Sequence, residues 1–170
     1  MLQVKGRARV MDESAQEAAR APLYLEDFAA GFRFTGGTRQ VSAEAITAFA
    51  LEFDPQPFHT DAEAAKSTFF GGLAASGWHT AALTMRLLIE SGLPIAGGFI
   101  GGSGEIAWPQ PTRPGDILTV ECEILAVTPS RSRPERGTIT LKMETLNQRR
   151  EVVQVFTAKV LVLRRGTATA

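Results

Sequence analysis

The chain is short of cysteine, histidine, net charge and long apolar runs, and each shortage excludes a class of protein. Cys122 is the single cysteine, so we expect no internal disulfide and no cysteine-based zinc site. Because the chain has only two histidines, a histidine-rich metal site is not expected either. The 18 basic and 18 acidic residues cancel, so no overall positive field points to nucleic acid as a partner.

A membrane-spanning helix needs about 18 apolar residues in a row, and no such run occurs. The first 20 residues are polar and have neither the apolar segment nor the cleavage pattern of a secretory signal. The sequence therefore predicts a soluble, cytoplasmic protein with no membrane partner. We expect residues 1–20 to form a flexible extension, residues 21–165 to form one domain, and residues 166–170 to form a flexible tail.

Apolar residues in the first half of the domain repeat with the period of an α-helix. This pattern predicts a helix over residues 43–52, with Ser42 as its N-cap, and a short helix over residues 61–66. Residues 77–91 are apolar over most of the helix circumference, which is typical of a buried helix. The stripe expected to be buried consists of Trp78, Ala81, Ala82, Met85, Leu88 and Ile89.

The second half of the domain changes to the period of two that is typical of β-strands. We expect a strand near residues 32–39, a glycine-rich strand over residues 98–108, and three consecutive strands near residues 118–126, 139–144 and 152–163. Strands joined by short turns indicate an antiparallel sheet. One long helix ahead of such strands predicts an α+β domain in which the sheet wraps around the helix.

The segment between Asp54 and His59 is the most informative part of the sequence. Pro55 and Pro57 restrict the backbone, so the segment is predicted to be a stiff loop. A carboxylate and an imidazole at its two ends could together move a proton of a water molecule. The alternative is that Asp54 caps a turn and His59 caps the next helix, and the spacing alone leaves both interpretations open.

Residues 53–65 resemble the hydratase motif of MaoC-like dehydratases, the (R)-specific enoyl-CoA hydratases. Two further elements of that family follow in the same order: a glycine that opens a long helix, and a proline-rich turn that leads into a strand. The resemblance extends over residues 23–163. The matching residues are Asp54, Gln56, Pro57, Phe58 and His59, then Ser76, Gly77 and Trp78, and finally residues 111–116.

The resemblance implies a hot-dog fold, in which a curved antiparallel sheet surrounds one long helix, here residues 77–91. Proteins of this family pair as homodimers or as dimers of dimers. Their reaction is the reversible syn addition of water to a trans-2-enoyl thioester, which gives an (R)-3-hydroxyacyl thioester. No separate cofactor is implied, because CoA is part of the enoyl-CoA or 3-hydroxyacyl-CoA substrate.

The same resemblance assigns a role to each matching residue. Asp54 and His59 are the expected catalytic residues, which hold the water and handle the proton that goes to C2. The backbone N–H of Gly77 is the expected oxyanion hole, because an amide at a helix N-terminus suits the negative charge that develops on the thioester carbonyl. The expected substrate-binding residues are Gln56, Phe58, Ser76 and Trp78.

Two positions depart from the family pattern. Gln56 stands where the family has Asn, and Ser76 stands where it often has His. We interpret both as signs of a subfamily with a different acyl preference, and they keep a non-catalytic acyl-CoA-binding subunit open as an alternative. A hot-dog thioesterase is another alternative, but Glu90, at the far end of the predicted helix, is the only acid on that helix.

Three arginines lie in a loop rich in serine and proline, and their guanidinium groups suit the phosphates of CoA. The alternative is a solvated loop without a ligand. His79, on the predicted long helix, is expected to be a structural residue, and Cys122 is expected to be a small buried apolar residue. The loop arginines are Arg131, Arg133 and Arg136, and other candidates for the phosphate contact are Lys66, Arg149 and Arg150.

Overall fold

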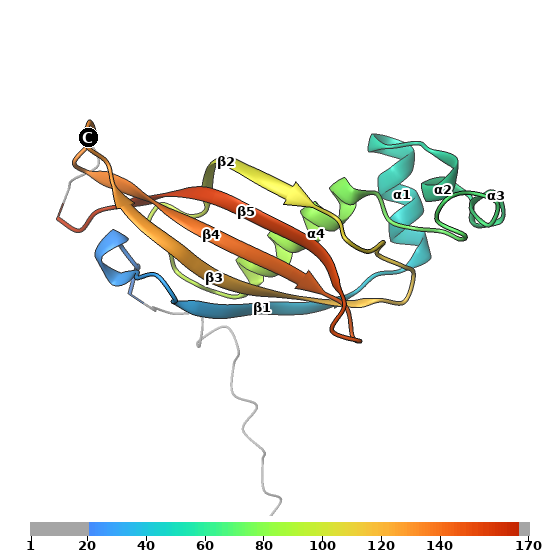
Figure 1. The fold of residues 1–170 in the computed structure, drawn as a ribbon, viewed down its shortest axis with the longest axis horizontal. Coiled ribbons are helices and arrows are strands. Elements are labelled where there is room, and N and C mark those ends of the chain that lie inside the picture. Colours follow the sequence, from blue (N-terminus) through green and yellow to red (C-terminus); the bar gives the residue numbers. More distant parts are fainter. Residues whose placement is uncertain (1–20, 167–170) are drawn as a thin grey trace, which may run out of the picture.

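A five-stranded antiparallel sheet packs against one long helix, α4 (Gly77–Glu90), in the computed structural model, which describes residues 21–166 (Figure 1). The strand order is β1-β3-β4-β5-β2, so β1 and β2 form the two edges. This arrangement is the hot-dog fold, and it confirms the predicted α+β class. The strands are β1 (Arg33–Gln40), β2 (Ile100–Ala107), β3 (Ile117–Pro129), β4 (Arg136–Leu146) and β5 (Val152–Leu163).

The predicted terminal segments fall almost entirely outside the described part of the chain. The extension expected over residues 1–20 lies outside it, and so does the expected tail apart from Gly166. No helix within residues 21–166 is long and apolar enough to cross a lipid bilayer.

Three short helices gather at one end of the sheet (Figure 1). α1 (Ala43–Phe53) begins after Ser42, whose hydroxyl accepts a hydrogen bond from the Ala45 N–H at 3.1 Å, as the N-cap prediction requires. α3 (Ala62–Ala65) follows where a short helix was expected. The stiff loop expected between them is partly wrong, because residues Pro57–Thr60 form a helical turn, α2. A proline suits the first position of a helix, where its missing N–H costs no hydrogen bond.

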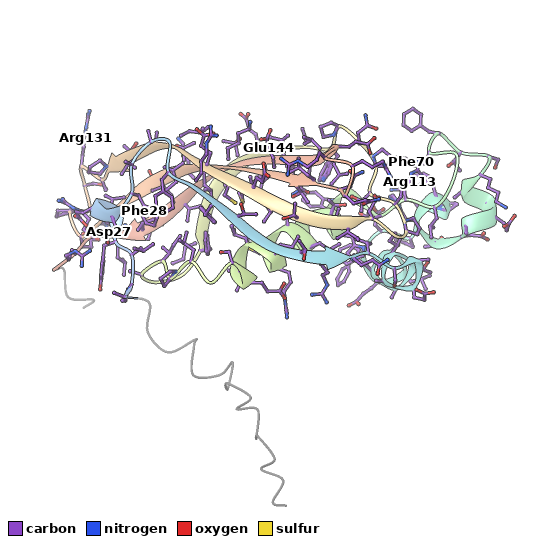
Figure 2. All side chains as sticks on the ribbon, turned by 90° about the horizontal axis from the view of Figure 1, so that it is seen from below. Asp27, Phe28, Phe70, Arg113, Arg131 and Glu144 are labelled. Carbon is purple, nitrogen blue, oxygen red and sulfur yellow. The ribbon has the colours of Figure 1, made fainter. Side chains whose placement is uncertain are left out.

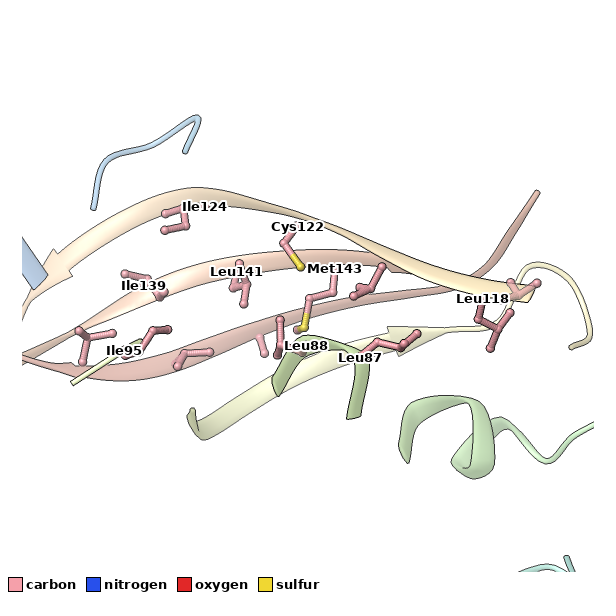
Figure 3. Close-up of a cluster of buried hydrophobic side chains, with 14 of the residues drawn as sticks. Leu87, Leu88, Ile95, Leu118, Cys122, Ile124, Ile139, Leu141 and Met143 are labelled. Carbon is pink, nitrogen blue, oxygen red and sulfur yellow. The ribbon is translucent and has the colours of Figure 1, made fainter. Parts of the chain in front are cut away.

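The main core lies between α4 and the inner face of the sheet (Figure 3). Alternate residues of β3 and β4 point into it, among them Ile124 and Leu141, and Leu87 and Leu88 meet them from the helix. Cys122 is 3% exposed, which confirms that it is a buried apolar residue. Burial, with a smaller contribution from the charge of Glu121, raises the pKa of its thiol to about 12, so the thiol is unreactive.

The buried face of α4 differs from the face that the apolar pattern predicted. Leu88 is buried as expected, but Trp78 is 62% exposed, Met85 41% and Ile89 54%. The helix instead buries two threonines, Thr80 and Thr84, against the sheet. The prediction went wrong because period alone cannot tell a face that packs on the sheet from an apolar face that is left open.

Threonine hydroxyls can be buried here because each one has a hydrogen-bond partner. Thr80 Oγ1 donates to Thr112 Oγ1 at 3.0 Å. Thr84 Oγ1 lies 2.6 Å from Thr145 Oγ1, on strand β4. These pairs fix the height and rotation of α4 above the sheet, and so they also fix the position of its N-terminus.

Candidate active site

Asp54 stands at the end of α1, where Pro55 prevents the helix from continuing. Its Oδ1 accepts a hydrogen bond from Gln56 Nε2 at 2.7 Å, and its Oδ2 accepts one from Ser76 Oγ at 2.6 Å. Burial acts to raise the pKa of Asp54, but the bonds from Ser76 and Gln56 and the nearby His59 outweigh it and hold the pKa below its usual value. The carboxylate is therefore ionised at neutral pH.

His59 belongs to α2 and is only 4% exposed. Its Nδ1 lies 2.7 Å from the carbonyl oxygen of Ala74. Because a carbonyl can only accept, Nδ1 carries a proton and donates it to this bond. The other ring nitrogen, Nε2, lies 3.5 Å from Asp54 Oδ2. The structure thus brings Asp54 and His59 together, with one nitrogen of the imidazole directed at the carboxylate.

Both positions that depart from the family pattern contact this carboxylate. Ser76, 22 residues away in sequence, is fully buried and uses its hydroxyl to donate to Asp54. This burial does not support the predicted contact between Ser76 and substrate. Gln56 is exposed and holds the other carboxylate oxygen, so the longer side chain of glutamine reaches Asp54.

The alternative role of helix capping does not account for His59. The cap of α3 is Asp61, which accepts hydrogen bonds from the backbone N–H groups of Glu63 and Ala64 at 2.8 and 3.0 Å. The imidazole of His59 is instead bonded to Ala74, in the segment that leads to α4. Phe58 packs edge-on against the ring, with 4.5 Å between the ring centroids, and shields it from water.

The N-terminus of α4 lies beside this pair. The hydroxyl of Ser76 accepts a hydrogen bond from the Trp78 N–H at 3.2 Å, and the Gly77 N–H is the first helix amide, without an intrahelical acceptor. A Cβ at Gly77 would lie 2.7 Å from Cε2 of Trp108. Glycine is therefore required here by the indole of Trp108, a reason that the sequence did not reveal.

Trp108 is held in place by Gln154, a residue that the sequence interpretation missed. The indole Nε1–H donates to Gln154 Oε1 at 2.9 Å, and Gln154 Nε2 donates to Thr84 Oγ1 at 2.8 Å. Gln154 is fully buried on β5. A single glutamine within an alternating strand carries no sequence signal, so only its burial and its partners reveal its role.

An apolar cavity of about 440 Å³ lies between α4 and strands β2 and β5. Trp78 and Met85 line it from the helix, and Phe99, Phe156 and Val160 line it from the sheet side. Among residues 21–166, no charged side chain lines it. Since Trp78 also adjoins Gly77, the cavity begins beside the N-terminus of α4.

The loop arginines do not reach this site within one chain. Arg131 lies at one end of the molecule, whereas Arg113 and Phe70 lie at the other end, near the helices (Figure 2). Arg133 lies in the same connection between β3 and β4, and Arg136 is the first residue of β4, so the contact of these arginines with CoA phosphates stays a prediction. The other candidates for a contact with CoA phosphates each have a carboxylate partner. Lys66 pairs with Glu63, Arg149 with Glu151, and Arg150 with Glu121.

His79 packs between α1 and α4. Its ring stacks on Phe49, with centroids 4.7 Å apart and planes 7° apart. Burial lowers the pKa of His79, so the ring is neutral at neutral pH. These contacts agree with the structural role expected for it.

An antiparallel sheet around one helix, with a carboxylate and an imidazole paired beside the N-terminus of that helix, defines the class: a hot-dog protein of the dehydratase kind. The family model described as "MaoC like domain" matches residues 31–147. The chain belongs to the MaoC-like family, and the predicted resemblance is confirmed.

Relatives and solved structures agree with this membership. The chain is 36% identical over 143 residues to "Uncharacterized protein YdeM" of Bacillus subtilis (strain 168), covering 83% of this chain and 98% of that protein. The MaoC-like dehydratase from Rhodospirillum rubrum is 63% identical with a TM-score of 0.82, covering 85% and 99% of the two chains. The (R)-hydratase from A. caviae involved in PHA biosynthesis is 26% identical with a TM-score of 0.63, covering 81% and 98%.

Proposed function

We propose that the protein is an (R)-specific enoyl-CoA hydratase, which also runs in reverse as a 3-hydroxyacyl-CoA dehydratase. The observation that carries this proposal is the convergence of Asp54 Oδ2 and His59 Nε2, 3.5 Å apart, beside the first amide of α4. That distance is longer than a direct hydrogen bond, and both atoms can contact one water molecule. The family membership and the likeness to an (R)-hydratase support this hydro-lyase chemistry.

In the hydration direction, the pair binds the water and takes up one of its protons as the oxygen bonds to C3 of the enoyl group. The π electrons of the C2–C3 double bond move toward the thioester carbonyl, which becomes an enolate. The pair then delivers a proton to C2 from the same face, so that one hydroxyl and one hydrogen are added syn. Because the lowered pKa of Asp54 keeps its carboxylate ionised, Asp54 is suited to accept a hydrogen bond from the water and so to hold it in place.

The enolate oxygen needs a hydrogen-bond donor, and we propose that the Gly77 N–H supplies it. As the first amide of α4, it has no acceptor within the helix, and the helix dipole adds positive potential there. Removing one such donor costs about 3 kcal/mol of transition-state stabilisation. This makes Gly77 the oxyanion hole of the proposed reaction.

The cavity beside Trp78 suits an uncharged acyl chain. Its volume of about 440 Å³ lies in the range of small-molecule sites, and the described residues that line it carry no charge. A dicarboxylic acyl group would leave a carboxylate unpaired in this apolar space, which is costly. We therefore propose straight or branched aliphatic enoyl-CoA as substrate, with no cofactor besides the CoA that the substrate carries.

A second copy of the chain is the proposed partner. Within the described part of the chain, β2 is an edge strand whose one sheet neighbour is β5, and nearly all of its residues are exposed. An open edge is a template for pairing with another strand. The exposed apolar side chains of α4, Trp78, Met85 and Ile89, add a surface that a partner would cover. These features support a homodimer or a dimer of dimers.

The test is the hydration of crotonyl-CoA and longer enoyl-CoAs, followed by the loss of the conjugated thioester absorbance. We expect activity in the unmodified protein and a loss of about 10²- to 10⁴-fold in Asp54→Asn and in His59→Asn. Glu123→Gln, on the sheet surface where Glu123 pairs with Arg33, is the matched control and should keep full activity. Full activity in both site variants would refute the assigned roles.

Two further measurements, of thiol release and of acyl-CoA binding, separate the two alternative functions. A thioesterase would release free thiol from acyl-CoA, but Glu90 pairs with Arg86 and Arg39 at the far end of α4, away from Asp54. A non-catalytic subunit would bind acyl-CoA without turnover. Thiol release without hydration would support the thioesterase in place of the hydratase. Tight acyl-CoA binding without hydration would support the non-catalytic subunit.

A further inference from the structure

Residues 66–76 form no helix or strand, and they connect α3 to α4; we call this segment the strap. The strap supplies the acceptor of the imidazole, because the carbonyl of Ala74 takes the Nδ1–H of His59 at 2.7 Å. The Ala74 N–H in turn donates to the carbonyl of Phe58 at 3.1 Å. The orientation of His59 therefore depends on the position of the strap.

One side chain outside the strap binds three of its carbonyl groups. The guanidinium of Arg113 donates through Nη2 to Phe70 at 2.5 Å, and through Nη1 to Gly72 at 2.8 Å and to Leu73 at 3.2 Å. These bonds satisfy backbone acceptors that have no helix or sheet partner. Arginine suits this task because its planar group holds several donors in a fixed geometry, whereas lysine has a single flexible ammonium.

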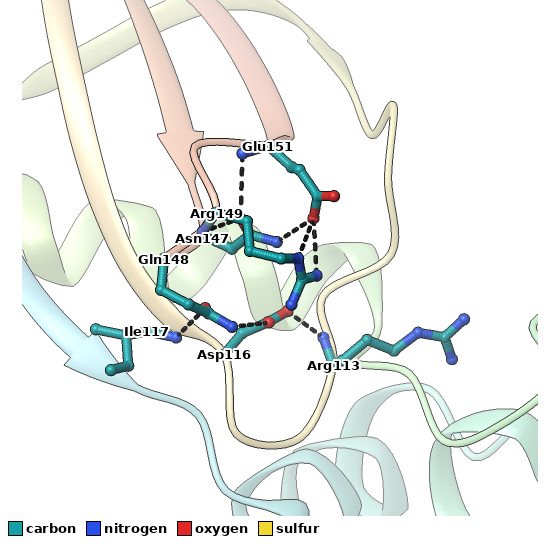
Figure 4. Close-up of polar contacts among 7 residues, drawn as sticks. All are labelled: Arg113, Asp116, Ile117, Asn147, Gln148, Arg149 and Glu151. Atoms are coloured by element: carbon teal, nitrogen blue, oxygen red, sulfur yellow. Dashed lines mark hydrogen bonds and ion pairs between the residues drawn. The ribbon is translucent and has the colours of Figure 1, made fainter.

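Arg113 is itself anchored at its backbone (Figure 4). Its N–H donates at 2.7 Å to Asp116 Oδ2, and Asp116 is only 2% exposed. The other oxygen of Asp116 accepts from Gln148 Nε2 at 3.2 Å. In Figure 4 the side chain of Arg113 extends away from this cluster. The guanidinium thus projects from a fixed turn toward the strap.

The residue before Arg113 fixes the other side of Ala74. The Ala75 N–H donates to the carbonyl of Thr112 at 2.9 Å. Ala74 therefore lies between two attachments to the same turn: the three guanidinium bonds on one side and the Thr112 bond on the other. The proline-rich turn of residues 111–116 matched the family as a sequence element, and here it holds the strap.

We propose that Arg113 is a positioning residue for His59 and that it acts through the strap. By fixing the carbonyls just before Ala74, it determines that Nδ1 of His59 carries the proton and that Nε2 is directed at Asp54. Its effect on catalysis rests on the proposed hydratase function, whereas its effect on the imidazole does not. Among the described residues, no carboxylate pairs with the guanidinium, so the strap carbonyls are its principal partners.

The experiment compares Arg113→Gln and Arg113→Lys with the unmodified protein by long-range ¹H–¹⁵N NMR of the histidine rings. The chain has two histidines, so the His59→Asn variant assigns the signals. We expect the Nδ1–H tautomer of His59 in the unmodified protein, and a mixture of tautomers with exchange of that proton at least tenfold faster in Arg113→Gln. The lysine variant should restore the tautomer only in part, and it keeps the test possible if the glutamine variant fails to fold.

Steady-state kinetics give the second measurement. We expect kcat for enoyl-CoA hydration to fall about 10- to 100-fold in Arg113→Gln, with KM within about twofold, because the imidazole is misplaced while the acyl cavity is unchanged. Arg33→Gln is the control, since Arg33 is an exposed arginine on β1 that pairs with Glu123. It should leave both the tautomer and kcat unchanged.

Two outcomes separate this inference from the proposed function. If the variants melt at a lower temperature but keep the His59 tautomer and the kcat of the folded enzyme, Arg113 only stabilises the fold and the proposal is overturned. If the tautomer changes in the variants while the unmodified protein hydrates no enoyl-CoA, the positioning role is supported and the hydratase function fails.

Discussion

The two ends of the sheet hold their polar groups in different ways. At the end that carries α1, α2 and α3, Ser76, Gln154 and Asp116 are almost completely buried, and each is hydrogen-bonded to a defined partner. At the opposite end, Arg164 pairs with Glu26, and Arg165 pairs with Asp27, between side chains that are about 30 to 60% exposed.

This difference shows in which part of the molecule the positions of polar side chains are fixed. A buried polar group that loses its partner costs its full desolvation free energy, so buried networks keep one arrangement. An exposed ion pair exchanges its partner for water at little cost. The buried polar groups with fixed partners therefore lie at the end of the sheet that carries Asp54 and His59. The polar groups at the opposite end form exposed ion pairs.

Among substitutions outside the Asp54–His59 pair, the largest effect on activity is expected from Gly77→Ala. Its new Cβ would lie 2.7 Å from the Trp108 indole, so the indole or the start of α4 must move, and the oxyanion donor moves with it. We expect a loss of about 100-fold in kcat for enoyl-CoA hydration, together with a change in tryptophan fluorescence.

Gly101→Ala is the steric control for that substitution, because a Cβ at Gly101 meets no atom of residues 21–166 within 4 Å apart from its own chain neighbours. It should leave the fluorescence and the melting temperature unchanged. Unchanged activity in Gly77→Ala would show that the start of α4 does not serve the reaction.

Gln154→Leu tests the buried network on its own. The substitution leaves the Trp108 indole N–H without its acceptor and removes one of the hydrogen bonds to Thr84 Oγ1, which keeps Thr145 and Thr80 as partners. We expect the free energy of unfolding to fall by about 1–3 kcal/mol. Urea denaturation measures the change, and Lys159→Gln, an exposed position on the same strand, should have almost no effect. Equal stability of the two variants would contradict the comparison between buried and exposed polar groups.

Ser76→Ala tests the control of Asp54 by its hydrogen bonds. The Ser76 hydroxyl helps to lower the pKa of Asp54, so its removal should raise that pKa. Because the proposed base must be ionised, the acidic limb of the kcat/KM profile should move to higher pH. Ser130→Ala, in the loop at the far end, should leave the limb in place.

The lowered pKa of Asp54 also has a consequence for the stability of the fold. A lowered pKa in the folded state means that the ionised Asp54 stabilises the fold above the pKa of an unfolded aspartate, about 3.9, and that this contribution is lost as the pH falls through the folded pKa. Ser76→Ala should therefore narrow the pH range over which this stabilisation is lost. If Ser76→Ala has the same acid denaturation midpoint as the unmodified protein, the hydrogen bond from Ser76 does not contribute to this stabilisation.

The smallest effect on stability and activity is expected from substitutions at the end of the sheet opposite to the site. Replacing Arg131, Arg133 and Arg136 together by Gln should change the melting temperature by less than about 2 °C, because exposed substitutions have small effects. We also expect KM for enoyl-CoA to stay unchanged, since Arg131 lies at the opposite end from the site (Figure 2). A severalfold rise in KM would instead support the phosphate contact predicted from the sequence, made to a site of the partner subunit.

Much of the fold could be predicted from the sequence because local patterns reflect local physics. The helical period placed α1 and α4 within a residue or two of their observed ends, and alternation placed β3, β4 and β5. The Asp54–His59 pair could be predicted from the resemblance to MaoC-like dehydratases, because the spacing of the two residues alone left a capping role open. The buried face of α4 could not, because its threonines need partners on distant strands.

The sequence by itself determined the elements, the fold class and the family, because these depend on periodicity and on residues that are close along the chain. Only the tertiary structure decided which groups support the site. Ser76 meets Asp54 across 22 residues, Arg113 meets the strap across about 40, and Trp108 meets Gln154 across 46. Such contacts follow from the packing of the whole sheet against α4, and no local pattern of residues encodes them.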